Sequence, residues 1–175
     1  ERAQAAGATV VTEPNRGYGN ACLRGLRRAT SAGDAIVVFL DADRSDFPRE
    51  MTALIEPIRQ GTADFVLGDR GGSDRPWHAR AGTELCVWLI NKLWRTDYRD
   101  LGPFRAIRRS AIDRLKMIDR TWGWTIEMQV KAAEVGLVIR EVSILQRARV
   151  GQSKISGTVT GTVKAGLRML YTIWC

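Results

Sequence analysis

Residues 36–46 read IVVFLDADRSD, an apolar run that ends abruptly in clustered carboxylates. The run is short and rich in β-branched residues, and no polar residue alternates with the apolar ones. This is the pattern of a strand covered on both faces within a parallel sheet. Ligands of such sheets gather at the carboxyl ends of the strands. We therefore expect a buried strand that opens onto a site.

Asp41 and Asp43 follow this strand at once and stand two residues apart. In an extended segment their side chains point the same way, so both carboxylates could approach one hard cation or a sugar hydroxyl. A shared cation would also relieve the repulsion between them. The alternative is that they merely begin a loop. For Asp46 we expect such a local role, as the cap of the next helix, because Pro48 occupies a first-turn position.

Composition indicates a globular protein with an anionic partner but does not identify that partner. The chain has 175 residues, 45% of them hydrophobic, which is enough for a core and argues against disorder. Twenty-seven Lys and Arg against 19 Asp and Glu give a formal charge of +8. This balance favours an anionic partner: nucleic acid, a phosphorylated metabolite or an anionic membrane surface. Three cysteines without metal-type spacing favour reduced thiols in a cytosolic compartment.

The remaining elements are predicted from periodicity. Strands are expected over 8–12, 64–68 and 137–144, and helices over 21–29, 48–60, 80–95, 110–115 and 126–133. Gly7 and Gly61 are read as helix stops, and Ser110 as a helix cap. In the helix over 80–95, the stripe of Leu85, Trp88, Leu89 and Leu93 is expected to face the core. Alternating strands and helices indicate a doubly wound α/β layer.

Two loops are candidates for binding anions. Gly17 and Gly19 precede a helix, where backbone N–H groups could approach a phosphate or ribose, although a tight turn explains them equally well. Arg70 lies in the loop after the strand over 64–68, at the same sheet edge as Asp41, and is therefore placed to meet an anion. No apolar run reaches the roughly 18 residues of a membrane span, and no signal peptide is visible.

The second half of the chain adds further basic and acidic candidates. A Gly-Pro turn delivers Arg105, and Glu127 lies in a first helical turn, where it either compensates the helix dipole or belongs to a site. Basic side chains flank Gly151 and a serine hydroxyl, a combination suited to gripping phosphate; they are Arg147, Arg149 and Lys154, with Ser153 between them. Nothing aromatic is interleaved, which disfavours a platform for single-stranded nucleic acid.

Taken together, the motifs stand in a fixed order: NRGYG (15–19), FLDAD (39–43), GDR (68–70), GPFR (102–105), WGW (122–124) before Glu127, and RVGQSK (149–154). This ordered set, which covers nearly the whole chain, resembles glycosyltransferase family two, especially its dolichyl- and polyprenyl-phosphate sugar transferases. The resemblance implies an α/β fold of the GT-A type, a mostly parallel, Rossmann-like sheet flanked by helices. The family's first two strands, with the loops that grip the nucleotide base, have no counterpart in the chain.

The resemblance further implies a nucleotide-sugar donor and a divalent cation, Mg²⁺ or Mn²⁺, held by the Asp-x-Asp motif against the donor's pyrophosphate. By position, Asp43 resembles the metal ligand, Asp41 a metal or ribose contact, and Arg70 the arginine that meets the diphosphate. Where the branch often has a glutamine as a further ligand, this chain has Ser45. Additional donor contacts are expected at Asn15, Gly17 and Ala42. Contacts to the acceptor or its phosphate are expected at Arg105, Glu127, Arg147, Arg149, Ser153 and Lys154.

The expected protein is thus a hexosyltransferase acting on a polyprenyl or dolichyl phosphate at the cytoplasmic face of a membrane, with no nucleic-acid partner. Residues 1–157 would form a partial catalytic domain, and residues 158–175 an amphipathic helix, either on the membrane surface or leading to a membrane segment. Two alternatives remain open. One is a nucleotidyltransferase of similar fold, and the other is a non-catalytic basic module that binds nucleic acid or membrane.

Overall fold

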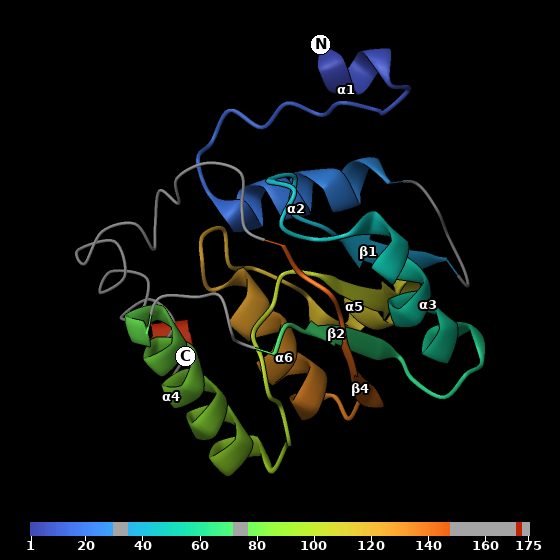
Figure 1. Ribbon diagram of the computed structural model, residues 1–175. Coiled ribbons are helices and arrows are strands. Elements are labelled where there is room, and N and C mark those ends of the chain that lie inside the picture. Colours follow the sequence, from blue (N-terminus) through green and yellow to red (C-terminus); the bar gives the residue numbers. More distant parts are fainter. Residues whose placement is uncertain (30–34, 72–76, 148–170, 173–175) are drawn as a thin grey trace.

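A four-stranded sheet with helices on both faces forms the body of the protein in the computed structural model (Figure 1). The structure describes residues 1–29, 35–71, 77–147 and 171–172. The strands are β1 (Ile36–Phe39), β2 (Phe65–Asp69), β3 (Arg105–Arg108) and β4 (Ile139–Ser143), in the order β1-β3-β2-β4. β2 and β4 are parallel, and β3 is antiparallel to β1 and to β2. The expected α/β sheet is present, with β1, β2 and β4 running the same way.

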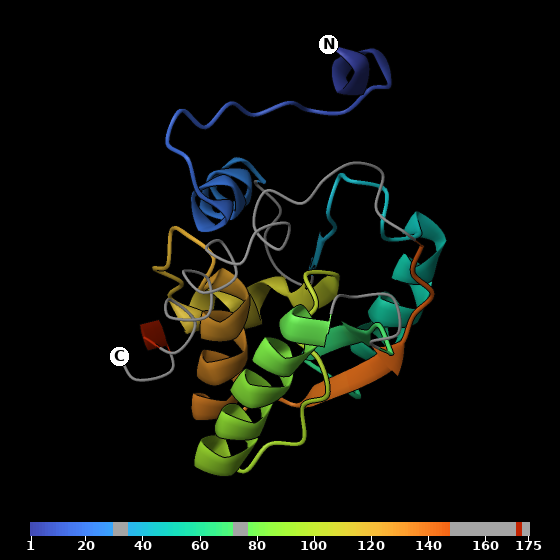
Figure 2. The same ribbon diagram turned by 60° about the vertical axis from the view of Figure 1, so that its left-hand side comes forward.

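The helices divide between the two faces of this sheet (Figures 1 and 2). One face of the sheet, which carries the larger hydrophobic core, is covered by residues from α2, α4, α5 and α6. The other face is covered by α3. Their bounds are α1 (Arg2–Ala5), α2 (Tyr18–Arg28), the 3₁₀ turn η1 (Pro48–Glu50), α3 (Met51–Arg59), α4 (Trp77–Trp94), α5 (Arg109–Leu115) and α6 (Trp124–Glu134). None of the helices in these described ranges is long and apolar enough to cross a bilayer.

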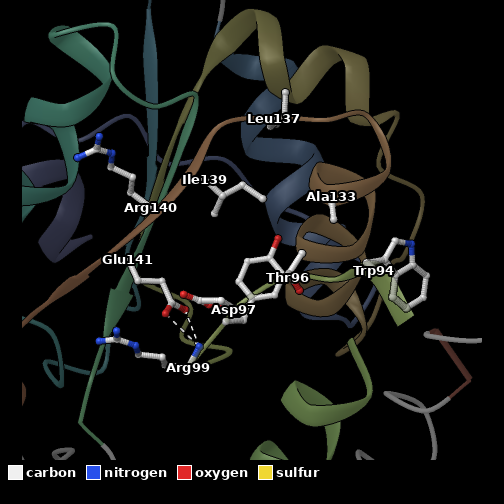
Figure 3. A pocket seen from close by; sticks show the side chains of 10 residues that line it. Trp94, Thr96, Asp97, Arg99, Ala133, Leu137, Ile139, Arg140 and Glu141 are labelled. Atoms are coloured by element: carbon white, nitrogen blue, oxygen red, sulfur yellow. Dashed lines mark hydrogen bonds between the residues drawn. The ribbon is translucent and has the colours of Figure 1, made fainter. Parts of the chain in front are cut away.

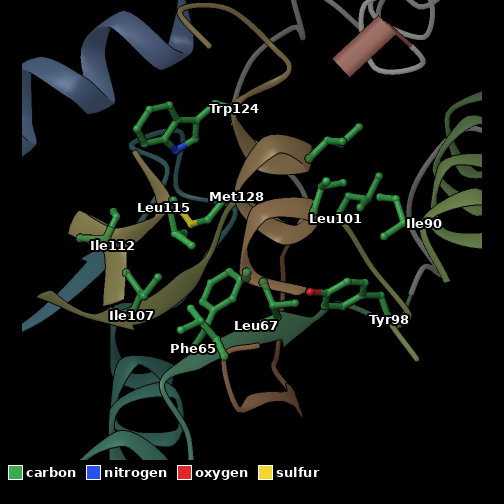
Figure 4. Packing of buried hydrophobic residues seen from close by; sticks show 14 of the residues in the cluster. Phe65, Leu67, Ile90, Tyr98, Leu101, Ile107, Ile112, Leu115, Trp124 and Met128 are labelled. Carbon is green, nitrogen blue, oxygen red and sulfur yellow. The ribbon is translucent and has the colours of Figure 1, made fainter. Parts of the chain in front are cut away.

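Alternation along the strands sorts side chains into two cores, because successive residues of a strand point to opposite faces. Val37 and Phe39 pack in the larger core, whereas Ile36 and Val38 pack with α3. The central strand β2 is buried along its first four residues. Figure 4 shows the larger core, which includes Phe65 and Leu67 of β2 and Trp124 and Met128 of α6. The predicted strand over the apolar run is present as β1, and its side chains pack against both cores. It is only half-buried, however, and its partner in the described sheet, β3, is antiparallel, so the expectation of a fully buried strand between parallel neighbours is wrong.

Strand β3 was not among the predicted elements. Only four residues long, it pairs Val37 with Ile107 and Leu67 with Arg105, and so joins the two strands whose ends carry the predicted site. Its sequence, RAIR, has two arginines and no β-branched run beyond one isoleucine. β3 forms because β1 and β2, on either side of it, supply hydrogen-bond partners for its backbone, although its own residues have little preference for a strand.

Two predicted caps are wrong. Asp46 does not cap η1, whose N-terminal flanking residue is Phe47 and makes no side-chain cap bond. Instead Asp46 is buried and bridges to Gln146. Ser110 lies inside α5, which begins one residue earlier at Arg109. In both cases the cap position was inferred from a local preference, and a tertiary contact or the end of a strand set the boundary instead.

Two further elements differ from expectation. Residues 8–12 form no strand and are largely exposed, since no described strand lies beside them to complete backbone hydrogen bonds. The segment runs apart from the body in both views (Figures 1 and 2). On α4, the core side carries Cys86, Val87 and Ile90, whereas the predicted core stripe is mostly exposed. An apolar pattern on both sides of a helix leaves the orientation undecided until the sheet is in place.

The two glycines at the start of α2, Gly17 at its N-cap and Gly19 in its first turn, are explained by a close approach of two backbones. A Cβ at Gly17 would lie 2.1 Å from the carbonyl oxygen of Arg120, and one at Gly19 would lie 2.1 Å from that of Asp119. The N–H of Gly19 donates to the carbonyl of Thr121 over 3.1 Å, and the N–H of Asn20 to that of Arg120 over 3.0 Å. These two N–H groups therefore already have partners, which favours a packing role for the Gly-x-Gly loop.

Replacing Gly19 with alanine should lower the free energy of unfolding by about 1–3 kcal/mol, because the added methyl overlaps a backbone carbonyl that cannot move alone. Gly25→Ala in the same helix is the control. Its methyl would meet nothing within 4 Å, so the variant should be neutral or more stable by up to about 1 kcal/mol. Urea unfolding followed by circular dichroism measures both. Equal stability of the two variants would contradict the described contact.

Candidate functional site

The acidic loop, residues 41–47, leaves the carboxyl end of β1 and turns sharply. Asp43 Oδ1 accepts hydrogen bonds from the backbone N–H of Ser45 over 2.9 Å and from its hydroxyl over 2.6 Å. Arg44 between them has a φ of 67°, a left-handed conformation uncommon for a residue with a side chain. The turn therefore fixes one oxygen of Asp43, and Ser45 orients this carboxylate by hydrogen bonding.

The chain that leaves β4 is tied to the acidic loop by four contacts. Gln146 Nε2 donates to Asp46 Oδ1 over 3.0 Å, and the Arg147 N–H donates to the Ser45 carbonyl over 3.0 Å. The Arg147 guanidinium donates to the carbonyl of Arg44 and lies 4.7 Å from the centre of the Phe47 ring. Of the predicted phosphate-binding residues, Arg147 thus contacts the acidic loop, at the residues that follow the Asp-x-Asp motif. Arg149, Ser153 and Lys154 lie outside the described residues.

Arg70, at the end of β2, forms a two-pronged ion pair with Asp100. Its Nε lies 2.5 Å from Asp100 Oδ2 and its Nη2 lies 2.7 Å from Oδ1. Burial alone would lower the pKa of the Arg70 guanidinium, but the hydrogen bonds to Asp100 and the charges of Asp100, Asp46 and Asp41 together raise it. Arg70 is therefore a permanent cation beside the acidic loop, and its two hydrogen bonds to Asp100 fix the position of its guanidinium.

The charge of Asp41 acts on two residues at the start of α2, Tyr18 and Cys22. The carboxylate is near enough to Tyr18 and Cys22 to affect both pKa values. Burial raises the pKa of the Cys22 thiol to about 11; Tyr18 and Arg105 oppose this shift and Asp41 adds to it. Burial likewise raises the pKa of the Tyr18 hydroxyl. Both groups stay protonated at neutral pH, so neither is a base beside Asp41.

Arg105 does not meet the expectation that it binds an acceptor phosphate. Its side chain is fully buried and donates to the carbonyls of Gly102 and Thr125, the latter over 3.0 Å. It also lies 5.7 Å from the centre of the Phe65 ring. Burial without a paired carboxylate lowers the pKa of this guanidinium to about 10. Arg105 organises the core behind the site rather than the site surface.

Glu127 and Asn15 are also engaged elsewhere. The Glu127 carboxylate accepts from the N–H groups of Ile118 and Asp119, over 2.9 and 2.8 Å, and from Lys131 Nζ over 2.7 Å. It thereby holds the loop against which α2 begins, which is neither of the two roles considered from the sequence. Asn15 is exposed and donates to Glu13 Oε1 over 2.9 Å, and no described contact joins it to the acidic loop.

The residues of the acidic loop fit a divalent cation that also has other ligands. Among the residues that the structure describes, no group of three His, Cys, Asp or Glu side chains could enclose a metal ion. Asp41 and Asp43 offer carboxylate oxygens, the ligands of Mg²⁺ and Mn²⁺. Mg²⁺ is commonly held by one or two carboxylates together with substrate phosphates. The donor set thus suits a cation that arrives with a phosphate ligand.

A cavity lined by other residues lies elsewhere in the fold. This cavity, of about 600 Å³, lies beside β4, between the end of α4 and the end of α6 (Figure 3). Glu141 at its wall accepts from the Arg99 N–H over 3.0 Å, and burial raises the pKa of this carboxyl. Arg99, Arg140 and Asp97 also line it, so its charges balance. It contains none of the predicted site residues.

Asp100 is the site residue that the sequence did not indicate. It follows no strand and belongs to no motif of paired carboxylates, and its partner Arg70 is 30 residues away. Gly102 explains how the two meet. A Cβ there would lie 3.0 Å from the carbonyl oxygen of Gly68 and 3.1 Å from Arg70 Nε. Gly102 therefore allows the loop that carries Asp100 to pass directly against the end of β2.

Comparisons with known proteins agree with this architecture. The family model described as glycosyl transferase family 2 matches residues 2–116. An uncharacterized glycosyltransferase of Mycobacterium tuberculosis is 36% identical over 163 residues, which cover 91% of this chain and 73% of the relative. An undecaprenyl-phosphate mannosyltransferase of Micrococcus luteus is 31% identical over 160 residues, which cover 83% of this chain and 63% of the relative.

Solved structures share the fold. Glucosyl-3-phosphoglycerate synthase from Mycobacterium tuberculosis, in complex with phosphoglyceric acid, superposes with a TM-score of 0.74 at 24% identity. A complex of the same enzyme with Mn²⁺, UDP-glucose and phosphoglyceric acid gives a TM-score of 0.73 at 22% identity. The chain is covered to 98% in both and spans 62% and 61% of the two solved chains. At this identity the likeness speaks for the fold alone, and it confirms the expected GT-A type of α/β fold.

Asp100→Asn should lower the free energy of unfolding by about 3–5 kcal/mol, because it leaves the buried Arg70 guanidinium without a counter-charge. The matched control is Asp113→Asn, which breaks the Arg109–Asp113 pair, in which the Asp113 side chain is 61% exposed. This change should cost less than about 0.5 kcal/mol. Denaturant titration compares them. A loss for Asp100→Asn as small as that of the control would mean that the pair does not hold Arg70.

Proposed function

This chain belongs to glycosyl transferase family 2, and on that premise we propose that it transfers a hexose from a nucleotide-sugar donor to a lipid-phosphate acceptor. Membership favours this reading over the nucleotidyltransferase and the non-catalytic module that the sequence left open. The observation that carries the proposal is the meeting of the acidic loop, Arg70 and Arg147 at one end of the sheet. Carboxylates for a cation and guanidinium groups for phosphates thus come together.

Asp43 and Asp41 are the proposed contacts to a divalent cation, Mg²⁺ or Mn²⁺. Ser45 keeps Asp43 oriented through its hydroxyl and N–H, which reduces the freedom lost when a cation binds. The bound cation would neutralise charge on the leaving nucleoside diphosphate. The proposed donor is of the same class as UDP-glucose, with which the structurally similar glucosyl-3-phosphoglycerate synthase has been solved in the presence of Mn²⁺.

Arg70 is the proposed contact to the donor's diphosphate. Its two hydrogen bonds to Asp100 fix the plane of the guanidinium, so that a phosphate meets a preorganised cation. Asn15, Gly17 and Ala42 remain proposed donor contacts. The N–H groups of Gly19 and Asn20, which follow Gly17, already donate to the carbonyls of residues 121 and 120. Arg147, with Arg149, Ser153 and Lys154 beyond it, is proposed for the acceptor phosphate.

A lipid phosphate is proposed as acceptor because the Micrococcus luteus relative acts on undecaprenyl phosphate, as its name states. A phosphate monoester is already anionic, so no general base is required to make it a nucleophile. This agrees with the site, where Tyr18 and Cys22 beside Asp41 have raised pKa values and stay protonated. Displacement at the sugar carbon would then depend on alignment and on stabilising the leaving group.

Calorimetric titration with UDP- and GDP-sugars, with Mn²⁺ and with chelator, tests the donor and the cation. Binding should require Mn²⁺ and should weaken at least about tenfold in Asp43→Ala, which removes a direct ligand of the cation. Asp113→Ala, an exposed carboxylate on α5, serves as control and should bind as the wild type does. Binding that ignores both Mn²⁺ and Asp43 would contradict the proposed site.

Transfer of labelled sugar distinguishes the acceptors. With the donor so identified, undecaprenyl phosphate and phosphoglyceric acid are offered in parallel, and label should appear in the lipid phosphate. Label in phosphoglyceric acid alone would overturn the lipid acceptor while leaving the family and the donor site in place.

A further inference from the structure

The outward side of α4 is apolar although nothing among the described residues covers it. Leu85, Trp88 and Leu93 expose 49%, 55% and 55% of their surface, while the opposite side of the helix is buried in the larger core. Leu85, Trp88 and Lys92 follow at intervals of three and four residues and therefore share one face. We call Leu85, Trp88 and Lys92 the α4 outer face. A helix apolar on both sides normally has partners on both sides.

Lys92 narrows the choice of partner. Its Nζ lies 4.9 Å from the centre of the Trp88 ring, in the middle of the α4 outer face. Against an apolar protein surface this ammonium would be buried without a counter-charge, which is unfavourable. At a bilayer surface, by contrast, a lysine lays its stem on the apolar region and keeps its charge among lipid phosphates. Tryptophan is enriched at the same boundary.

The charge of α4 also favours an anionic partner. The helix and its end carry Arg80, Lys92 and Arg95 against a single acidic residue, Glu84, within a chain of formal charge +8. The negative headgroup phosphates of anionic lipids would attract this positive charge.

We propose that the α4 outer face docks on the surface of an anionic lipid bilayer. Docking deepens the proposed function, since a lipid-phosphate acceptor stands in such a surface. The helix would lie in the interface, with Leu85 and Trp88 in the headgroup–acyl boundary and Lys92 at the phosphates. It does not span the bilayer, in agreement with its hydropathy.

Co-sedimentation with vesicles tests the docking, using phosphatidylglycerol mixed with phosphatidylcholine against phosphatidylcholine alone. The whole chain should bind the anionic vesicles, and Trp88→Glu should weaken this at least about tenfold, because it removes the largest exposed apolar group and adds a repelled charge. Lys92→Gln should weaken binding about fivefold and reduce its salt dependence. Ile118→Glu is the matched control, a 73% exposed isoleucine away from α4, and should bind as the wild type does.

Wild-type affinity in Trp88→Glu would overturn the docking surface, as would equal binding to neutral vesicles. A concentration-dependent dimer in sedimentation equilibrium that Trp88→Glu abolishes, without vesicle binding, would assign the face to a second copy of the chain instead. Vesicle binding is measured without donor or cation, and Asp43→Ala should retain it. Failure of the transferase assays would therefore be distinguishable from failure of the docking.

Discussion

A buried guanidinium holds the centre of this protein together. Arg105, on the antiparallel strand β3, donates to carbonyls of the 101–102 turn and of α6, and to Gln129 Oε1 over 3.4 Å. Gln129 in turn donates to the Asp100 carbonyl over 3.1 Å, and its own carbonyl accepts from the Tyr98 hydroxyl over 2.9 Å. One charge solvated by backbone dipoles thus joins the sheet, α6 and the 98–102 segment. The position of Asp100, and through it of Arg70, follows from this network.

The arrangement separates the charges that hold the site in place from those that face a ligand. Arg105 and Glu127 are buried and satisfied by backbone groups, so they fix the 101–102 turn and the 118–121 loop. Arg70 and Asp43 each use part of their hydrogen-bonding capacity on a fixed neighbour. Preorganisation of this kind reduces the reorganisation needed when charge develops on a leaving group. The sheet thus holds the loops in place, and the loops at its carboxyl edge carry the charged side chains of the proposed site.

Sequence reasoning reached the parts of this design that are local. The apolar run of β1, the strand β2 and the amphipathic α3 are recognisable from period and composition, and the order of the motifs indicated the family. It did not reach what depends on contacts between distant segments. β3 has too little propensity to be predicted alone, Asp46 was assigned to a neighbouring helix rather than to Gln146, and the Arg70–Asp100 pair has no signature at either residue. The exposed stripe of α4 was misread because both sides of that helix are apolar.

The two outer strands of the sheet differ in a way that matters for how the protein meets other chains. β4 carries Arg140 and Glu141 at consecutive positions, so that both of its faces present a charge beside the edge. Charged residues on an edge strand discourage intermolecular pairing and aggregation. β1, the opposite outer strand of the described sheet, reads IVVF and carries no charged side chain. Among the described strands, charge therefore opposes pairing with another chain along β4 but not along β1.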